Sequence, residues 1–333
     1  MANFVWCQGS KVAGCHPIRP CIDRNNRSET GFQLVVPLQA DNAIDPNNGK
    51  TLVSLVVSTC GRTTTLEDLF KSLDLQTHKN FEVIIVDQND DDRLDSLFKR
   101  SKWPFPLWHI HTPAERGLSR GRNVGWKKAQ GSVVLFPDDD CWYPSWFISH
   151  ALDLLAATGS DLVSGRAADQ DGNSINGRYE TKAQAIDRAN VWTTGIEWTI
   201  VFKRSTLVAV DGFDPEIGIG ASTPWQSCEG QDIVLRALAR GLKAYFDPSL
   251  YGYHAKFAVE KEANSTGKGR RYGRGLGYVL RRHGYGLWSA LNWIARPAVK
   301  SALSLAEGKL SAFQYYRNTA IGRFEGWSGR LLG

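Results

Sequence analysis

The sequence predicts an α/β fold built on a mostly parallel sheet, with helices on both faces and a helical C-terminal tail. Three observations predict it. From Leu52 onward, short apolar runs alternate with longer segments of helical periodicity, the order expected of a doubly wound sheet. The apolar run at 133–136 is short and begins with β-branched residues, as a buried strand does. Apolar residues recur at helical spacing from 287 to 294.

In the first half of the chain, strands are expected at 52–58, 82–86, 107–111, 133–136 and 161–165. Helices are expected between them at 65–75, 94–99, 117–129 and 145–157, the third with Ser119 as its N-cap. Because a helix lies between successive strands, the strands run in parallel, and their carboxyl ends meet at one edge of the sheet.

The second half is less regular. In order, it predicts a polar loop at 169–189, a strand at 197–202, a helix that opens at Glu229 and ends at Gly241, and a last strand at 243–246. The apolar cluster at 287–294 predicts a further helix, and Pro297 is expected to begin a second, short one.

These elements divide the chain into an N-terminal arm at 1–50, a main α/β domain at 51–255 and a basic, tryptophan-rich helical region at 256–333. Within the arm, 31–36 is expected to add an edge strand. The arm also carries a cluster of possible metal ligands, Cys7, Cys15, His16 and Cys21. Their spacing fits no standard zinc pattern, so free thiols in a reducing compartment are favoured over a zinc site.

Composition is that of a soluble globular protein, with 42% hydrophobic and 22% charged residues. Residues 1–12 lack the basic start and apolar core of a signal peptide. The long uncharged stretch at 284–295 is shorter than the roughly 20 residues that cross a bilayer. We therefore expect neither a transmembrane helix nor secretion.

Three carboxylates, Asp138, Asp139 and Asp140, follow the strand at 133–136 without a break. Two like charges about 4 Å apart cost roughly 1 kcal/mol in water and about 4 kcal/mol at a partly shielded site. A hard divalent cation removes that cost, and oxygen ligands suit Mg²⁺ or Mn²⁺. The alternative is a solvated acidic turn.

The same sheet edge gathers other polar residues. Thr59 and Asp87 end the first two strands, while Arg120, Arg122 and Asn123 lie at a helix start. Carboxylates, arginines and a helix N-terminus together suit a diphosphate. A phosphate loop, a Gly-x-Gly-x-x-Gly after the first strand and a Gly-x-Ser-x-Gly elbow are all missing, which argues against the P-loop, classical dinucleotide and serine-hydrolase classes. The glycine-rich run 273–277 lies outside any βαβ unit.

From about Leu52 to His254 the chain resembles glycosyltransferase family 2, whose members have the GT-A fold. The matching motifs, in chain order, are Val56-Val57-Ser58-Thr59, Val86-Asp87, the run Gly117-Leu118-Ser119-Arg120-Gly121-Arg122-Asn123-Val124-Gly125, Phe136-Pro137-Asp138-Asp139-Asp140, and Glu229-Gly230-Gln231-Asp232 with Leu235-Arg236. Residues 272–283 further resemble the tail of bacterial members that build exopolysaccharide.

The resemblance implies roles for these residues. Thr59 and Asp87 would contact the nucleotide base and ribose, and Arg122 would join that pocket or touch the diphosphate. The nucleotide-sugar contacts as a whole would be Thr59, Arg62, Asp87, Arg122, Asn123, Asp138 and Asp139. The metal ligands would be Asp138, Asp140 and His254, with Asp140 the direct ligand. For His254 a satisfied core or surface histidine is an equal alternative.

The catalytic base is expected at the start of the helix that opens at Glu229. An inverting transfer needs a carboxylate to take the proton of the acceptor hydroxyl. Family members usually have Glu-Asp here, with the Asp as base, whereas this chain has Gly230 in the second position. Asp232 or Glu229 must then serve, and we favour Asp232. Both could instead be helix caps.

The C-terminal region joins basic residues to an apolar face. Between 256 and 283 there are eight Lys or Arg and two Glu, and Trp288 and Trp293 follow at helical spacing. This combination favours an interfacial membrane helix. The alternative is that the face packs on the main domain. No nucleic-acid-binding module is visible, so nucleic acid is not an expected partner.

The resemblance therefore implies a metal-dependent, inverting hexosyltransferase. It would move a sugar from a nucleoside-diphosphate sugar to a polysaccharide or lipid-linked glycan. Its expected place is the cytoplasm, peripheral on the inner face of the plasma membrane. Two alternatives stay open. A nucleotidyltransferase of related fold would normally show a glycine-rich basic loop near residue 58, which this chain lacks. A catalytically inactive nucleotide-sugar-binding protein would explain Gly230.

Overall fold

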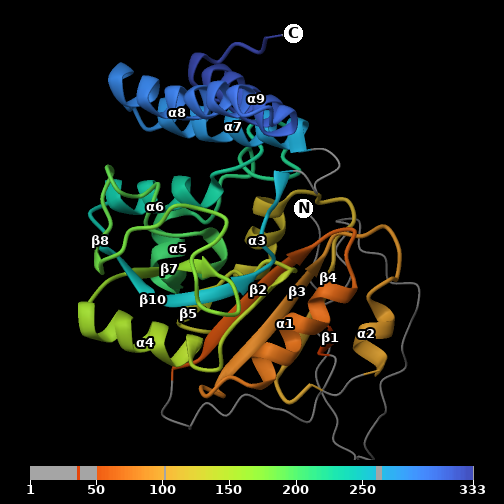
Figure 1. Ribbon diagram of the computed structural model, residues 1–333. Coiled ribbons are helices and arrows are strands. Elements are labelled where there is room, and N and C mark those ends of the chain that lie inside the picture. The colour runs from red at the N-terminus through yellow and green to blue at the C-terminus, as the bar shows by residue number, and fades with distance from the viewer. Residues whose placement is uncertain (1–35, 38–50, 101–102, 260–264, 333) are drawn as a thin grey trace, which may run out of the picture.

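The computed structural model describes residues 36–37, 51–100, 103–259 and 265–332 (Figure 1). The cysteine cluster and nearly all of the predicted N-terminal arm lie outside these residues. Of the predicted edge strand at 31–36, only Val36 is described. It forms β1 (Val36–Pro37), which pairs antiparallel with the edge of the sheet at Trp108 and His109.

The first half of the sheet is parallel, as predicted. It comprises β2 (Val53–Thr59), β3 (Phe81–Asp87), β4 (Leu107–His111) and β5 (Val133–Leu135), in the order β4-β3-β2-β5. The intervening helices are α1 (Thr64–Asp74), α2 (Asp95–Arg100) and α3 (Leu118–Trp126). The register sets Thr59 beside Asp87 and Asp87 beside His111. The polar residues that end these strands are therefore neighbours.

The second half of the sheet is mixed. Strand β9 (Val201–Lys203) lies antiparallel between β5 and β7 (Leu162–Ala168), and β10 (Ala244–His254) runs parallel to β7. Two short strands, β6 (Cys141–Trp142) and β8 (Gln184–Ala185), pair antiparallel with β10. The strand predicted at 197–202 begins instead as the 3₁₀ turn η1 (Glu197–Thr199).

Helices cover both faces of the sheet and enclose two cores. One core packs α1 and α4 (Phe147–Thr158) through Leu69 and Phe147. The other packs α3, α5 (Arg204–Val210) and α6 (Glu229–Ala239) through Trp126, Leu207 and Ile233. This arrangement confirms the α/β sheet with helices on both faces.

The expected cap of α3 is wrong in detail. Gly117 occupies the N-cap position with a φ of 124°, and Ser119 lies inside the helix. The Ser119 hydroxyl donates instead to the carbonyl of Ile217, at 2.6 Å. Positive φ suits glycine, and it lets Gly117 lie against Gly220, whose carbonyl oxygen would be 3.1 Å from an added Cβ.

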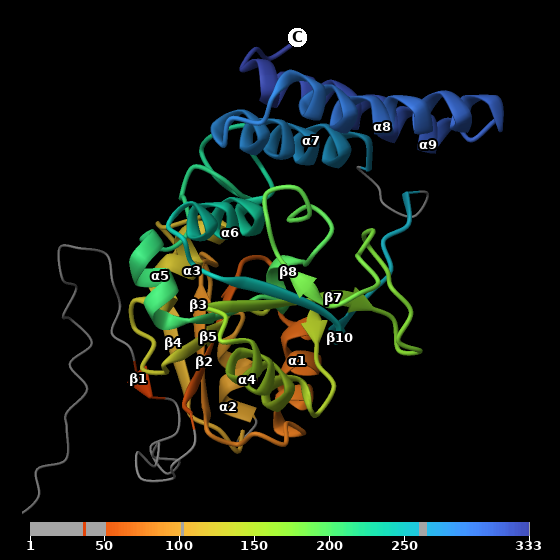
Figure 2. The same cartoon turned by 90° about the vertical axis from the view of Figure 1, so that its left-hand side faces the viewer.

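The C-terminal region forms a layer of helices above α6, namely α7 (Ser265–Arg282), α8 (Leu287–Ala306) and α9 (Leu310–Ser328) (Figures 1 and 2). In the described part of the chain, no helix is long and apolar enough to cross a membrane. Pro297 does not begin a helix as predicted but lies inside α8. A proline there leaves the carbonyl four residues earlier without its N–H partner. Arg323 of α9 fills that gap, because its Nη1 donates to the carbonyl of Trp293 at 2.5 Å.

The glycine-rich run joins α7 to α9. A Cβ added at Gly273 would lie 2.5 Å from the carbonyl oxygen of Thr319, and one at Gly277 would lie 2.0 Å from that of Arg323. On the facing helix, a Cβ at Gly326 would lie 2.0 Å from the carbonyl oxygen of Arg274. The glycines therefore let two helix backbones touch.

Candidate active site

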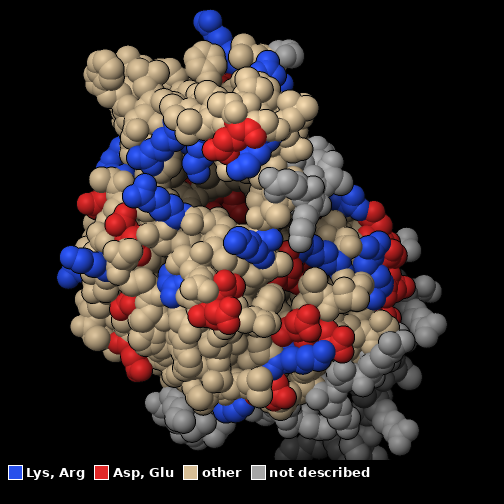
Figure 3. All heavy atoms as spheres, viewed as in Figure 1, with Lys and Arg blue, Asp and Glu red and all other residues tan. Residues whose placement is uncertain are grey.

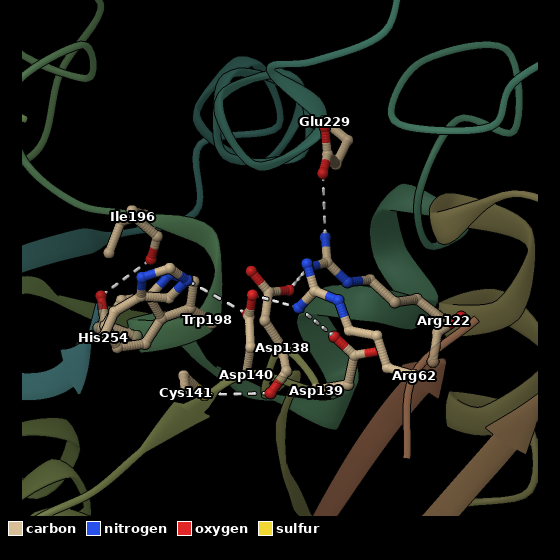
Figure 4. A network of polar contacts seen from close by, with 12 residues as sticks. Arg62, Arg122, Asp138, Asp139, Asp140, Cys141, Ile196, Trp198, Glu229 and His254 are labelled. Atoms are coloured by element: carbon tan, nitrogen blue, oxygen red, sulfur yellow. Dashed lines mark hydrogen bonds and ion pairs between the residues drawn. The ribbon is translucent and has the colours of Figure 1, made fainter. Parts of the chain in front are cut away.

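The carboxyl ends of β2 and β5 converge on one polar cluster (Figure 4). Thr59, at the end of β2, donates from Oγ1 to Asp139 Oδ2 at 2.7 Å. Arg62, just beyond it, places Nη1 2.9 Å from Asp139 Oδ1 and also pairs with Asp140. His254, at the end of β10, has Nε2 3.2 Å from Asp140 Oδ1 and stacks on Trp198.

The three consecutive carboxylates differ in their pKa values. Burial raises the pKa of Asp139 to about 6, in spite of Arg62 beside it. Burial and repulsion from Asp140 also raise the pKa of Asp138, against the pull of Arg122. Burial acts the same way on Asp140, but His254 and Arg62 outweigh it and bring its pKa below the ordinary value. Asp140 is therefore the member of the three that stays charged most readily.

Arg122 connects this cluster to α6. Its side chain is 1% exposed, its Nη2 donates to Asp138 Oδ1 at 2.8 Å, and its Nη1 lies 3.4 Å from Glu229 Oε1. The guanidinium also lies over the ring of Phe213, and its buried Nε has no hydrogen-bond partner among the described residues. Figure 4 shows Glu229 and Asp138 on opposite sides of this guanidinium. One arginine thus pairs with the carboxylates of both Asp138 and Glu229.

A further carboxylate, Glu197, was not predicted as part of this site. A Cβ added at Gly230 would lie 2.2 Å from Glu197 Cγ and 3.1 Å from its Oε1. Burial and repulsion from Glu229 raise the pKa of Glu197 to about 7, and burial also raises the pKa of Glu229. The only feature of the sequence that could have indicated Glu197 is the missing side chain at Gly230. A glycine at this position does not tell which segment packs against it.

Asp232 has a different environment. Its carboxylate is fully buried and contacts two arginines and a histidine: Arg236 Nε at 2.7 Å, Arg282 Nε at 3.3 Å and His283 Nε2 at 2.8 Å. Burial raises its pKa, but these partners bring it below the ordinary value. Arg282 and His283 belong to α7 and the residue that follows it, so Asp232 links α6 to the C-terminal helices. These contacts favour a structural role over the predicted role as base.

Asp87 and Asn123, the remaining predicted residues, differ in how the fold uses their side chains. Asp87 ends β3 near Thr59, accepts hydrogen bonds from Asn89 and lies 3.1 Å from His109 Nε2. Burial would raise its pKa, but these partners lower it. Asn123 uses its amide within the fold instead, donating to the carbonyl of Phe213 at 2.7 Å and accepting from Trp126 Nε1 at 3.0 Å.

The donor set at the end of β5 suits a small, hard cation. Asp140 Oδ1 and His254 Nε2 are 3.2 Å apart, close to the about 3 Å between adjacent ligands of an octahedral ion with bonds near 2.1 Å. Carboxylate oxygen and imidazole are ligands that Mn²⁺ accepts. Among the described residues no group of three His, Cys, Asp or Glu side chains is already arranged around one point, since Asp138 faces Arg122.

The surface is hollowed between the C-terminal helices and the sheet domain (Figure 3). Acidic side chains lie inside the hollow, and Lys and Arg side chains lie around it.

Comparison with known proteins matches part of the chain to a family model. The family model for Glycosyl transferase family 2 matches residues 54–207. An uncharacterized glycosyltransferase of Haemophilus influenzae is 35% identical over 94 residues, or 28% of this chain and 31% of the relative. A dolichol-phosphate mannosyltransferase of Pyrococcus furiosus is 29% identical over 114 residues, or 34% of this chain and 32% of the relative. The chain thus spans about a third of the length of these relatives.

Solved structures share the fold. The mannosyltransferase PcManGT of Pyrobaculum calidifontis, solved with GDP-Man and Mn²⁺, has a TM-score of 0.56 and 17% identity, covering 85% of this chain and 90% of that one. Residues 1–349 of TarS from S. aureus have a TM-score of 0.51 and 17% identity, covering 85% and 93%. The likeness is one of fold. Together, the two findings mean that residues 54–207 match the model of Glycosyl transferase family 2 and that the chain has the GT-A fold of these solved structures.

Proposed function

We propose that this chain is an inverting, metal-dependent glycosyltransferase that moves a sugar from a nucleoside-diphosphate sugar to a polysaccharide or lipid-linked glycan. The observation that carries the proposal is that carboxylates outnumber their basic partners at the sheet edge. Four carboxylates, those of Asp138, Asp139, Asp140 and the buried Glu229, have only two arginines and one histidine as basic partners among the described residues. Such a site favours a cation and, through it, a diphosphate.

The donor would lie across the ends of β2 and β3. Asp87 has its carboxylate held by Asn89 and His109, which suits it to accept hydrogen bonds from a base or ribose. Arg62, 47% exposed at its side chain, would exchange its contacts with Asp139 and Asp140 for a diphosphate. The internal hydrogen bonds of Asn123 give its predicted donor contact little support.

Asp138, Asp140 and His254 would hold Mg²⁺ or Mn²⁺. Bound there, the ion would neutralise the charge that develops on the departing nucleoside diphosphate. The Mn²⁺ and GDP-Man of PcManGT, which shares the fold, support this assignment.

The acceptor proton would pass to the paired carboxylates Glu197 and Glu229. A base works best when its pKa lies near the working pH, and burial beside Glu229 brings the pKa of Glu197 to about 7. Because the two acids repel each other, they titrate as a pair. Asp232 is the weaker candidate, since its carboxylate is already held by two arginines and a histidine.

The C-terminal helices would contact the membrane surface. Several large apolar side chains of α8 and α9 are exposed, among them Trp288 at 84% and Leu303 at 58%. Of the basic residues in this region, Arg270 pairs with Glu325 and Arg282 with Asp214. The exposed apolar side chains therefore carry the membrane proposal.

The test of the transfer reaction is product analysis. The protein is incubated with UDP- and GDP-sugars and Mn²⁺, and released nucleotide is separated by chromatography. Release of nucleoside diphosphate supports the proposal. Release of sugar 1-phosphate, the group that a nucleotidyl transfer from these donors would leave, would mean a nucleotidyltransferase. If no donor is either transferred or hydrolysed, the protein is an inactive binding protein. Asp140→Asn should abolish release, whereas the exposed control Asp171→Asn should not.

A further inference from the structure

A second cavity lies apart from the carboxylates, between the C-terminal helices and the segment that precedes η1. Its volume is about 670 Å³. The cavity is lined by aromatic residues (Trp192, Trp293, Tyr315 and Tyr316) and by cationic residues (Arg178, Arg296, Lys300 and Arg323). The lining that the structure describes contains no Asp or Glu. Neither the donor site nor the metal site uses these side chains.

The aromatic rings offer several flat faces. Trp192 lies 5.6 Å from Trp293 between ring centroids, and Tyr315 lies 5.2 Å from Tyr316. The planes are inclined by 52° and 74°, so the rings face different directions instead of stacking. An aromatic face is apolar and carries partial negative charge, which matches the C–H face of a sugar ring.

The cations of this cavity lack carboxylate partners. Within the described residues no salt bridge involves Arg178, Arg296, Lys300 or Arg323. Arg296 lies 4.4 Å and Arg323 5.7 Å from the ring centroid of Trp293, and Lys300 lies 5.4 Å from that of Tyr316. Arg296, Lys300 and Arg323 thus lie beside ring faces and have no described carboxylate partner, so their charges are available to an anion.

One buried donor in the lining has no acceptor. Arg323 Nε is buried and has no hydrogen-bond partner among the described residues. Burial also lowers the pKa of Arg323 to about 10. With several cationic side chains, several aromatic rings and no acid in its described lining, the cavity suits a ligand that brings acceptors and negative charge.

We propose that this cavity binds an anionic oligosaccharide, whose sugar rings lie on the aromatic faces and whose carboxylates or phosphates pair with the cations. Its role as the acceptor site rests on the proposed function. The wall residues Trp192 and Thr193 lead directly into η1 and Glu197, so one segment serves both the cavity and the proposed base. Sugar binding itself does not depend on the transfer reaction.

The test is calorimetric titration of the full chain with hexagalacturonate and with the neutral hexasaccharide maltohexaose. The double variant Arg296→Gln/Lys300→Gln removes two exposed cations of α8 that no described carboxylate pairs with. Lys127→Gln/Lys128→Gln, exposed on the sheet domain, removes the same charge elsewhere. We expect hexagalacturonate to bind at least tenfold more tightly than maltohexaose. We also expect the first variant to weaken it at least tenfold and the second less than twofold.

Equal affinity for the two sugars, no binding of hexagalacturonate, or equal losses in the two variants would overturn the proposal. Nucleotide binding, measured on the same samples, should be unchanged in both variants. If transfer activity is never found but hexagalacturonate binds as described, the proposed function fails while the anionic-saccharide site stands.

Discussion

The two regions of the molecule hold their carboxylates in opposite ways. In the C-terminal helices two arginines share one acid: Glu325, fully buried, binds Arg270 and Arg274. At the sheet edge several acids share each cation. Arg122, for example, pairs with both Asp138 and Glu229. Burial opposes both arrangements, yet the pKa of Glu325 falls to about 2 while those of Asp138 and Glu229 rise.

This difference distinguishes carboxylates that hold the fold together from carboxylates that take part in chemistry. An acid with a surplus of cations is fully paired and holds two elements together, as Glu325 holds α9 to α7. Acids with a deficit of cations cost stability unless another cation or a proton joins them. They are retained where chemistry needs them. By the same measure Asp232, with two arginines and a histidine as partners, belongs with Glu325.

The largest effect should come from Glu197→Gln. General-base catalysis contributes roughly 10²–10⁴-fold, so we expect turnover at saturating donor and acceptor to fall in that range with little change in donor affinity. In the parent, activity should fall as the pH drops below about 7, because the raised pKa of Glu197 means that the pair then takes up a proton. In the variant the residual activity should lose this limb, since Glu229 no longer feels repulsion from Glu197.

Asp232→Asn is the matched comparison. Its loss should be in stability, because the variant leaves Arg282 and His283 without their shared acid. If Asp232→Asn abolishes turnover in a stably folded protein while Glu197→Gln stays active, then the sequence-based preference for Asp232 is right and the structural interpretation is not.

Glu325→Gln should give the next largest effect. Breaking a buried ion pair costs about 3 kcal/mol or more, and we expect that loss in the free energy of unfolding measured with urea. The pKa of Glu325 lies below its ordinary value of 4.5. Its contribution is therefore complete above pH 4.5 and is lost as the pH falls from there toward about 2. Glu307→Gln, at an exposed acid that follows α8 as its C-cap, should change the unfolding free energy by less than about 1 kcal/mol. Equal effects of the two variants would refute the role given to Glu325.

A smaller effect is expected from Trp288→Ser. Removing one large apolar side chain from a lipid contact loses about 1.5–3 kcal/mol, so vesicles of anionic phospholipid should bind the variant at least tenfold more weakly in a sedimentation assay. Leu75→Ser, at an exposed apolar residue beside α1, should bind like the parent. If the parent protein does not bind such vesicles, the membrane proposal is wrong.

The sequence predicted which residues gather at this sheet edge, because backbone pairing positions them. Thr59 and Asp87 end parallel strands and Asp138 follows a third, and the register of a parallel sheet brings strand ends together. Glu197 escaped notice because it meets Gly230 only through the tertiary fold. The uninterrupted course of α8 through Pro297 depends likewise on Arg323, which a distant helix supplies.

The central claim is that the three acids that follow β5 bind a cation and, through it, a diphosphate. Calorimetric titration with UDP and GDP tests this claim most directly. Parent protein and Asp140→Asn are each measured with Mn²⁺ and with EDTA. The account predicts that the parent binds at least one of the nucleotides, at least tenfold more tightly with Mn²⁺, and that Asp140→Asn loses this gain while its thermal stability is retained. Nucleotide affinity that is the same with Mn²⁺ and with EDTA in the parent would contradict it.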